Sequence, residues 1–498
     1  MKHSKQIRIS GYAMLLALLC TASAITACGG DGETKESVTT EQKTAAITES
    51  ETLGRWKDAL PETLDLNGEN IVVFTRGDEA SVLEIDAQEE IGEVLNDAIF
   101  HRNRDLEERL NMTLKVQPGS TWQNYHQDLQ LIRSSIAAGD NAWQIISVWG
   151  PFNSQLVLEN CFYDLSEMSY LDPSAPWWNQ SAVEALTIAG KRFLMAGDSS
   201  VLTMLGEAFV VFVNDTMCQK YDINDIHDLV RDGKWTLQKL TEYSKLAMAD
   251  LDGSGTMDKT DQYGLLLVAG NAADSLYTAA DIHQITLSDG LPVYDPDIER
   301  MSKLMEILYP LCYDGDMYGS YTYGAPIEQA FVSGQGLMAI HPLDHARTTF
   351  RGMEDSYTIV PLPKLDEAQE NYYTPAYNGL GLQCIPADNP NPEAAAAVME
   401  AMAAASHYEV TPVYFETCLQ EKYARSEETV EMLEIIRQTQ YVDVEFLWRE
   451  ALGDAAFTMR DMIIQKKSDV ASWVAKKDKS VRASIENTIQ LLEEMKNW

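Results

Sequence analysis

A twelve-residue acidic loop carries the oxygen donors that a calcium ion requires. Its side-chain oxygens stand at the first, third, fifth, ninth and twelfth positions, which are Asp250, Asp252, Ser254, Asp258 and Asp261. Gly255 holds the sixth position, where the loop of an EF-hand turns sharply, and Thr256 at the seventh offers its backbone carbonyl. The pattern predicts a structural Ca²⁺ site. An acidic surface turn without metal is the alternative, because Asp261 has a shorter arm than the glutamate usual at position twelve.

The first part of the chain that reads as folded alternates strands and helices. Short apolar runs predict strands, and apolar residues at helical spacing predict helices. In chain order these are strand 70–74, helix 91–110, strand 112–116, helix 122–138 and strand 143–149. Such alternation is typical of a doubly wound α/β fold, whose ligands bind at the carboxyl ends of the strands. Arg76 and Asp78 follow one strand and Trp149 ends another, so these three are candidate ligand-binding residues.

The remainder of the chain also mixes strands and helices. Further strands are predicted at 191–195, 208–213, 263–268, 337–340 and 358–361. Helices are predicted at 236–248 and 392–406, and a last helix places Val481, Ile485, Ile489 and Leu492 on one face. About 440 residues follow the N-terminal region, which is too many for one simple core and indicates two lobes.

The composition argues against a nucleic-acid-binding surface. Asp and Glu number 76 against 38 Lys and Arg, giving a net charge of −38, whereas binding to phosphates requires a basic footprint. The cysteines beyond Cys28 are odd in number and lack CxxC spacing; they are Cys161, Cys218, Cys312, Cys384 and Cys418. Free thiols are therefore expected rather than a disulfide framework or a metal cluster.

The N-terminus has the pattern of a secretory signal. Lys2, Lys5 and Arg8 precede an apolar run over 12–25, which is short for a membrane span. The run closes on Ile25-Thr26-Ala27-Cys28, which looks like the lipobox of a bacterial lipoprotein, with cleavage before Cys28 and a lipid on its thiol. Residues 1–27 are thus expected to be a lipoprotein signal peptide, with an ordinary signal peptide as the alternative. The polar, Gly-, Thr- and Ser-containing stretch 28–55 predicts a flexible tether.

Several short stretches, taken in order, resemble one family. They are Asp164-Leu165-Ser166, Pro176-Trp177-Trp178, Ala196-Gly197-Asp198, Asp232-Gly233-Lys234-Trp235-Thr236, the acidic loop through Tyr263-Gly264, and the segment 361–369. Together with the lipobox, they make the chain similar to the extracellular solute-binding proteins, family 1, of bacterial ABC importers, the group that contains maltose-binding protein.

The resemblance implies a fold and a division into lobes. The fold class would be α/β, of the type 2 periplasmic-binding-protein kind, with two lobes, a hinge and a ligand cleft between them. The chain would cross between lobes near residues 200, 380 and 425. One lobe would then comprise 56–200 plus 380–425, and the other 201–379 plus 426–498.

Two ligand-binding positions can be carried over from the family. The strand that ends in Trp149 is similar to one whose tryptophan faces the sugar in maltose-binding protein. Glu207-Ala208, followed by apolar residues and Asn214, resembles a segment whose glutamate contacts ligand, which makes Glu207 the best polar candidate. Where that protein places an aromatic after Gly-Pro, this chain has His341-Pro342-Leu343-Asp344, so the resemblance leaves the same substrate in doubt.

The chemistry of sugars adds further candidates. Sugar sites pair aromatic platforms with carboxylates, amides and Arg, because sugars present apolar C–H faces and a ring of hydroxyls. The full set of ligand-binding candidates is Arg76, Asp78, Trp149, Glu207, Tyr277, Asp344, Tyr377, Asn378 and Trp448. Each aromatic has core packing as its alternative, and Arg76 and Asp78 have a plain surface ion pair. Trp177, Trp178 and Trp235 are expected to pack at helix entries.

The function expected from these features is solute capture without catalysis. The chain would be a lipid-anchored, extracellular, monomeric receptor on the outer face of the bacterial cytoplasmic membrane. It would deliver a carbohydrate or oligosaccharide to the membrane subunits of an ABC importer, with peptides and polyamines as alternative solutes. A surface-anchored glycan-active hydrolase is less favoured, because no G-x-S-x-G, HExxH or P-loop motif occurs. A calcium-dependent adhesion module is also less favoured, because dockerins need the acidic loop twice.

Overall fold

A computed structural model describes residues 57–313, 317–319, 325–376, 379–420 and 427–495. The chain divides into two units, Met1–Leu53 and Gly54–Trp498, and the second contains every described residue. The signal peptide, Cys28, the tether, Tyr377 and Asn378 all lie outside the described residues. Among the helices of the described ranges, none combines the length and apolar character needed to cross a membrane.

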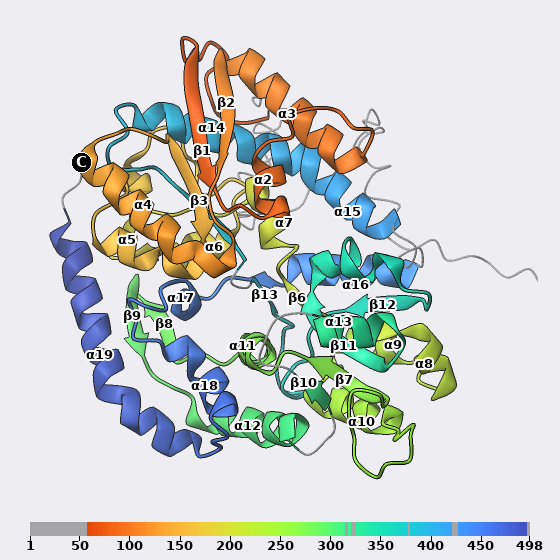
Figure 1. The fold of residues 1–498 in the computed structure, drawn as a ribbon. Coiled ribbons are helices and arrows are strands. Elements are labelled where there is room, and N and C mark those ends of the chain that lie inside the picture. The colour runs from red at the N-terminus through yellow and green to blue at the C-terminus, as the bar shows by residue number, and fades with distance from the viewer. Residues whose placement is uncertain (1–56, 314–316, 320–324, 377–378, 421–426, 496–498) are drawn as a thin grey trace, which may run out of the picture. The chain divides into compact units, whose positions relative to one another are not determined.

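The first sheet has the strand order β14-β3-β1-β2 (Figure 1). Strands β1 (Glu69–Thr75), β2 (Met112–Pro118) and β3 (Ile145–Trp149) run parallel, and β14 (Gly381–Cys384) is antiparallel to β3. β1 and β3 carry apolar runs because helices cover both faces of the sheet, whereas the edge strand β2 alternates buried and exposed residues. Ile71 and Val73 share a core with α3 (Val94–Leu110) and α14 (Pro392–Ala405), while Phe74 shares one with α4 (Tyr125–Ala138).

The second sheet has the strand order β10-β7-β11-β6-β12. Strands β10 (Met317–Gly319), β7 (Tyr263–Leu267) and β11 (Gly336–Pro342) run parallel, while β6 (Phe209–Asn214) is antiparallel to both β11 and β12 (Tyr357–Val360). Helix α10 (Leu237–Ala247) covers one face, and α13 (Ala325–Val332) covers the other. The buried residues alternate accordingly: Val211 and Val213 belong to the first core, and Val210 and Phe212 to the second.

The chain passes between the two sheets several times. It leaves the first sheet after β3 and enters the second at β6, then returns after β12 to form β14. Two short strands, β13 (Thr374–Pro375) and β15 (Gln440–Tyr441), pair in parallel near the return (Figure 1). The lobe boundaries expected near residues 200, 380 and 425 stay a prediction.

The remaining elements complete the two layers around each sheet. The helices are α2 (Glu79–Ile85), α5 (Ser154–Leu158), α6 (Gln180–Leu186), α7 (Val201–Met204), α8 (Asp215–Lys220), α9 (Ile226–Arg231), α11 (Ala269–Ala279), α12 (Ile298–Tyr313), α15 (Thr411–Gln420), α16 (Glu427–Gln438), α17 (Val444–Leu447), α18 (Thr458–Ile464) and α19 (Val470–Glu494). Two hairpins pair β4 (Thr187–Ile188) with β5 (Lys191–Arg192), and β8 (Ile285–Ser288) with β9 (Leu291–Tyr294).

The strand predictions are confirmed except at 191–195, where only Lys191 and Arg192 form a strand. Phe193, Leu194 and Met195 are buried there, and Met195 makes a single antiparallel bridge to Gln383 instead of a ladder. Helix α3 begins at Val94, so Ile91 lies outside it and is exposed. The thiols of Cys161, Cys218, Cys312 and Cys384 are free.

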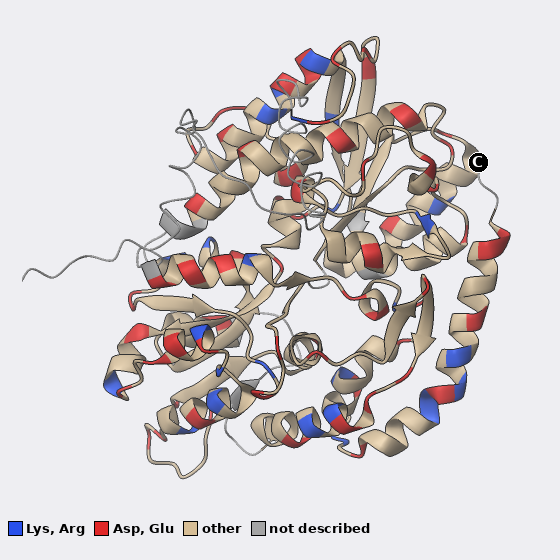
Figure 2. Ribbon diagram, turned by 180° about the vertical axis from the view of Figure 1, so that it is seen from behind, with Lys and Arg blue, Asp and Glu red and all other residues tan. Residues whose placement is uncertain are grey.

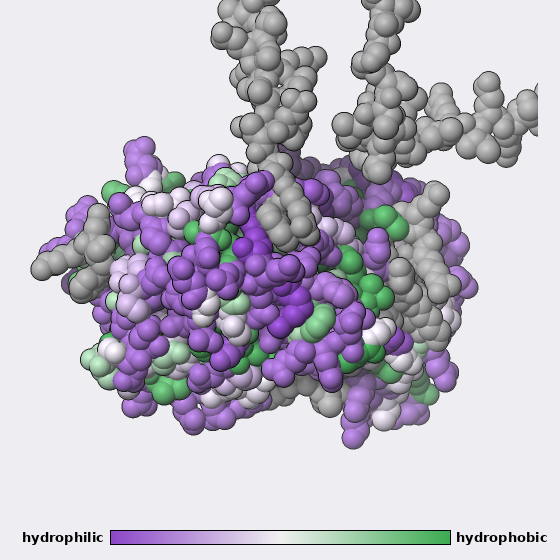
Figure 3. Space-filling view, turned by 90° about the horizontal axis from the view of Figure 1, so that it is seen from above, coloured by the Kyte–Doolittle hydropathy of each residue, from purple (hydrophilic) through white to green (hydrophobic). Residues whose placement is uncertain are grey.

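The acidic side chains are spread over the surface rather than gathered in one patch. Figure 2 shows Asp and Glu on elements of both sheets, with Lys and Arg interspersed along α19. Figure 3 shows one face on which hydrophilic side chains dominate and hydrophobic ones form small separate areas. This distribution fits a well-solvated exterior rather than a broad apolar contact surface on the face shown.

Candidate functional site

Arg76 is held rigidly at the carboxyl end of β1. Its side chain is 2% exposed, and its Nε donates hydrogen bonds to Asp78 Oδ2 at 2.9 Å and Ser81 Oγ at 2.8 Å. Its Nη1 donates to the carbonyl oxygen of Gly379, which precedes β14. Asp78 also caps α2, since its carboxylate accepts from the Ser81 backbone N–H. The Arg76–Asp78 ion pair, which was the alternative to ligand binding, therefore exists, but Arg76 is buried at the end of the sheet rather than on the surface.

Glu207 lies where the ends of the two sheets meet. It precedes β6, and a Cβ added at Gly379 would fall 2.3 Å from its Cδ, so the two residues are in close contact. Burial raises the pKa of Glu207, the Arg76 charge opposes that shift, and Asp78, Asp344 and His345 are its other charged neighbours. Burial together with several nearby charges is typical of a binding site.

Asp344 approaches the same place from the second sheet. It lies in the short helix η5 (Leu343–Ala346), directly after β11. Its backbone N–H donates to the Gly206 carbonyl at 2.8 Å, and its carboxylate pairs with Arg347 at 2.9 Å. Arg76, Asp78, Glu207 and Asp344, chosen from the sequence, thus converge on one site.

An aromatic cluster borders this site. The Arg76 guanidinium lies over the Trp149 ring, 3.9 Å from its centroid. Trp122 meets Trp149 edge-on at 5.3 Å and stacks on Tyr125 at 5.0 Å, and Phe152 packs beside both. Trp122 follows β2 and is 44% exposed, whereas Trp149 is 8% exposed. Sequence reasoning missed Trp122, Tyr125 and Phe152; a large aromatic just after a predicted strand was the available signal for Trp122.

Several buried polar atoms near these rings lack protein partners. Nε1 of Trp149 and both polar side-chain atoms of Asn153 have no hydrogen-bond partner among the described residues. Asn153 is fully buried beside the carboxyl end of β3. Buried polar atoms without a partner are costly, so they are natural contacts for water or for the hydroxyls of a solute.

Glu84 lies beneath the site and is also fully buried. It accepts hydrogen bonds from the Thr203 backbone N–H at 3.0 Å and from Thr203 Oγ1, linking α2 to α7. Burial raises the pKa of Glu84 to about 8, and the nearby Arg76 charge only partly offsets that shift. Its carboxyl group therefore links α2 to α7 without facing solvent.

Two predicted aromatic platforms are placed in the core instead. Trp448 is 1% exposed, and its indole N–H donates to the Ala185 carbonyl at 3.1 Å. Tyr277 lies in the buried helix α11 and is 2% exposed. Their large apolar surfaces are buried by packing against segments that are distant in the sequence. The prediction that Trp448 and Tyr277 face a solute is therefore wrong for this conformation. Trp177, Trp178 and Trp235 are likewise core residues, as predicted.

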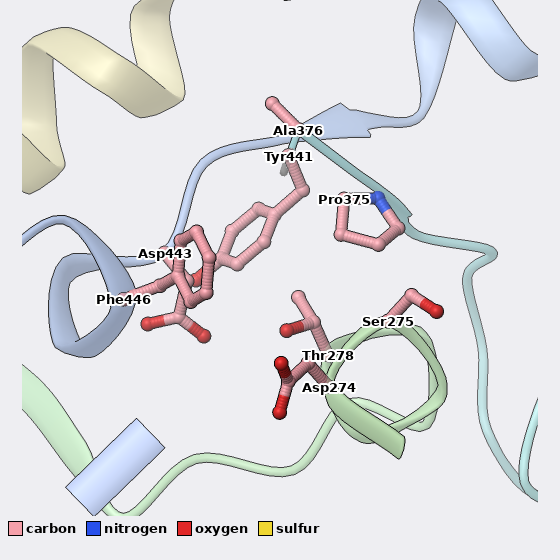
Figure 4. Close-up of a pocket in the computed structure, with 8 residues that line it drawn as sticks. All are labelled: Asp274, Ser275, Thr278, Pro375, Ala376, Tyr441, Asp443 and Phe446. Carbon is pink, nitrogen blue, oxygen red and sulfur yellow. The ribbon is translucent and has the colours of Figure 1, made fainter. Parts of the chain in front are cut away.

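A small polar cavity lies beside α11. Figure 4 shows Asp274 and Thr278 from this helix pointing toward Tyr441, Asp443 and Phe446. Asp274 forms an ion pair with Arg460. The cavity volume of about 10 Å³ has room for roughly one water molecule, so it is no solute site in this conformation.

Comparison with known proteins is informative at the level of structure. The sequence matches no protein-family model and no curated protein. Three solved structures are each similar over 86% of this chain. A cyclo/maltodextrin-binding protein complexed with maltotetraose has 14% sequence identity, 97% of its chain covered and a TM-score of 0.54. The galacto-N-biose-/lacto-N-biose I-binding protein of the ABC transporter from Bifidobacterium longum, in complex with lacto-N-biose, has 11% identity, 99% coverage and a TM-score of 0.58, and an ABC substrate-binding protein from Listeria monocytogenes in complex with cycloalternan has 14% identity, 99% coverage and a TM-score of 0.52. The chain has the type 2 periplasmic-binding-protein fold.

In the type 2 periplasmic-binding-protein fold, each sheet with its helices is one lobe, and the ligand cleft lies between the lobes. The carboxyl ends of β1, β2 and β3 carry Arg76, Trp122 and Trp149. Glu207 and Asp344 come from the other sheet, before β6 and after β11. The site therefore occupies the strand ends where open α/β sheets bind ligands.

Three carboxylates of the acidic loop lie close together. One carboxylate oxygen from each of Asp250, Asp252 and Asp261 lies within 4.8 Å of the others. The Gly255 backbone N–H donates to Asp250 at 2.7 Å, and Gly255 has φ +79°, the left-handed conformation that glycine adopts freely. Asp261 is buried and accepts from the Leu251 and Asp258 N–H groups. Asp250, Asp252 and Asp261 therefore offer a set of oxygen donors that fits Ca²⁺, whereas the Thr256 carbonyl accepts a hydrogen bond from Ser254 Oγ at 2.9 Å.

Proposed function

We propose that this protein is the solute-binding receptor of an ABC importer and that its solute is a carbohydrate. The observation that carries the proposal is the site between the two sheets, where the exposed Trp122 ring packs on Trp149, Trp149 carries Arg76, and Arg76 lies near Glu207. An aromatic ring stacks on the C–H face of a sugar, and carboxylates and guanidinium groups bind its hydroxyls. The similar solved structures carry maltotetraose, lacto-N-biose and cycloalternan, which supports a saccharide.

The site favours binding over hydrolysis. A glycosidase needs one carboxylic acid to protonate the leaving oxygen and a second carboxylate to act as base or nucleophile. Here Asp78 is paired with Arg76 and caps α2, and Asp344 is paired with Arg347. The similar solved structures are binding proteins. We therefore infer a receptor that closes around its solute and, in its loaded form, engages the importer's membrane subunits.

The proposal includes an attachment and a cofactor. A lipid on Cys28 would hold the protein at the outer face of the cytoplasmic membrane, with residues 28–55 as the tether, and the receptor would act as a monomer. A Ca²⁺ ion in the loop 250–261 would have a structural role, because the loop packs beside α10 and β7 and not at the solute site.

Isothermal titration calorimetry of the purified protein against saccharides, peptides and polyamines tests the proposal. We expect one saccharide class to bind with a stoichiometry of one and to raise the thermal midpoint, because a ligand of the native state stabilises it. Binding of a peptide or a polyamine in place of any saccharide would show that the sugar assignment is wrong while leaving the receptor function intact. Cleavage of a bound oligosaccharide, detected by chromatography, would instead favour the hydrolase.

A further inference from the structure

Three metal-ligating side chains converge at the end of β11 in the second sheet. His341 belongs to the strand, His345 to η5 and Glu328 to α13. One donor atom from each lies within 4.8 Å of the others, and His345 Nε2 is 3.2 Å from Glu328 Oε1. The rings of His341 and His345 have centroids 4.6 Å apart. The cluster is distinct from the acidic loop, which offers oxygen donors alone.

His341 is the observation that points to a ligand. Its side chain is 1% exposed, and neither ring nitrogen has a hydrogen-bond partner within the described ranges. The neighbouring ring of Phe350 meets His341 edge-on at 5.6 Å and offers it no polar atom. A buried imidazole with both nitrogens unpaired loses the hydrogen bonds to water that it makes in the unfolded chain, which is energetically costly. A metal ion bound to one nitrogen would remove that cost at this nitrogen.

A comparable cluster elsewhere shows the contrast. His283 bonds Asp443 through Nδ1 at 3.0 Å and approaches Asp281 through Nε2 at 3.4 Å. The carboxylate of Glu445 in the same cluster accepts from the Gln284 and Ile285 backbone N–H groups. Because its members already have partners, that cluster is a complete hydrogen-bond network and needs no ion.

We propose that His341, His345 and Glu328 bind a divalent first-row transition metal, with Zn²⁺ as the ion that fits them best. Ligand bonds of 2.0–2.1 Å in a tetrahedron place donor atoms about 3.3 Å apart. The 3.2 Å between His345 Nε2 and Glu328 Oε1 already matches this spacing, and the other donor-atom distances, which are within 4.8 Å, would shorten on binding. Two imidazoles and one carboxylate form a zinc ligand set that leaves a fourth position open.

The surroundings give the ion an entrance. The side chains of His345 and Glu328 are 14% and 17% exposed. These two ligands would therefore form the solvent-facing side of the metal site, and the buried His341 would form its inner side. His345 also lies near Glu207. The ion would therefore lie on the second-lobe side of the solute site, with its open position available to water or to another oxygen ligand.

Calorimetric titration of chelator-treated protein with Zn²⁺ tests this proposal. We expect one equivalent to bind and to be displaced by a stronger chelator. Since losing even an indirect partner of a zinc ligand costs 10- to 100-fold in affinity, we expect His345→Gln and Glu328→Gln to weaken binding by at least about 100-fold. Both positions are partly exposed, so these variants should fold; thermal unfolding without metal checks this, and His341→Gln serves as a third, more disruptive variant.

Matched controls separate this site from the other histidines and from the acidic loop. His227→Gln, His283→Gln and Asp252→Asn should all retain Zn²⁺ affinity. Co²⁺ bound in place of Zn²⁺ should give the visible spectrum of a tetrahedral ion in the wild type and lose it in His345→Gln. Absence of Zn²⁺ uptake, equal affinity in the wild type and the two ligand variants, or loss of binding only in His283→Gln or Asp252→Asn would overturn the proposal.

Discussion

The guanidinium of Arg76 covers one face of the Trp149 indole at 3.9 Å from the ring centroid. Trp122 meets the same indole edge-on, and only 8% of Trp149 remains exposed. Trp149 thus acts mainly as the support on which Arg76 rests through a cation–π contact. The ring that is free to stack on a solute is Trp122, since 44% of it is exposed.

Replacing Trp122 with alanine should therefore weaken solute binding, at a further cost in stability because the ring also packs on Tyr125, Trp149 and Phe152. An aromatic anchor at the centre of a binding site contributes about 2 kcal/mol or more, which corresponds to roughly 30-fold in Kd. Calorimetry with the saccharide found in the panel measures the change. Tyr408→Ala, which removes another exposed aromatic ring, is the control and should leave Kd unchanged. Equal affinity of Trp122→Ala and the wild type would exclude Trp122 as the platform.

Gly379 should be sensitive because it leaves room for Glu207. A Cβ at this position would fall 2.3 Å from Glu207 Cγ and Cδ, so Gly379→Ala must push the flexible Glu207 side chain aside. We expect a stability loss under about 1 kcal/mol, because a side-chain end can move, but solute binding weakened by about 10-fold through loss of a charged hydrogen bond. Gly352→Ala, where nothing lies within 4 Å, should change neither quantity. A loss of stability without any change in Kd would place Glu207 outside the solute site.

Glu400 should give the stability a pH dependence of defined sign. It lies in α14, accepts from the indole N–H groups of Trp177 and Trp178, and is 1% exposed. Burial raises its pKa to about 7 from an ordinary value of 4.5. Between these values the folded state keeps a proton that the unfolded state has released. Its contribution to stability is therefore greatest below pH 4.5, falls as pH rises to about 7, and is constant above.

The substitution Glu400→Gln removes that titration. The free energy of unfolding of the variant relative to the wild type should rise across this pH window by about 3 kcal/mol at most, and then level off. Denaturant unfolding at a series of pH values measures the difference. Met399→Leu, a neighbouring buried change without a titratable group, should give a difference that does not vary with pH. A flat difference for Glu400→Gln would show that Glu400 ionises normally in the fold.

The sequence predicted the parts of the site that depend on local features. β1 and β3 are apolar runs, and the polar or aromatic residues at their ends are visible without a structure, which is why Arg76, Asp78 and Trp149 were found. The position of Trp122 depends on how β2 pairs with β1 and β1 with β3, and its exposure is not encoded locally. The prediction that Trp448 faces a solute was wrong for the converse reason. Trp448 is buried against Ala185, which lies 263 residues away in the sequence. The pairing of Glu328 with His345 likewise requires the second sheet to be assembled.

Removal of calcium should lower the thermal midpoint of the protein. The loop keeps its three carboxylates within 4.8 Å, and without a cation these charges repel one another. At a Ca²⁺ concentration ten times its Kd, binding contributes about 1.4 kcal/mol. Differential scanning calorimetry with Ca²⁺ and with a chelator should show this shift in the wild type and its loss in Asp250→Asn. Glu486→Gln, an exposed change on α19, should keep the shift. A midpoint that ignores Ca²⁺ in the wild type would identify the loop as a metal-free turn.

Lipid attachment at Cys28 is the final prediction. The small residues before Cys28 and the apolar run over 12–25 match the order that a lipoprotein signal requires. In a Gram-positive host, the wild type should incorporate labelled fatty acid and sediment with membranes. Cys28→Ala should lose the label and no longer sediment with membranes, because no other thiol follows a lipobox. Cys20→Ala, which removes a thiol inside the apolar run, should retain both label and sedimentation. Labelled, membrane-bound Cys28→Ala protein would place the attachment elsewhere in the chain.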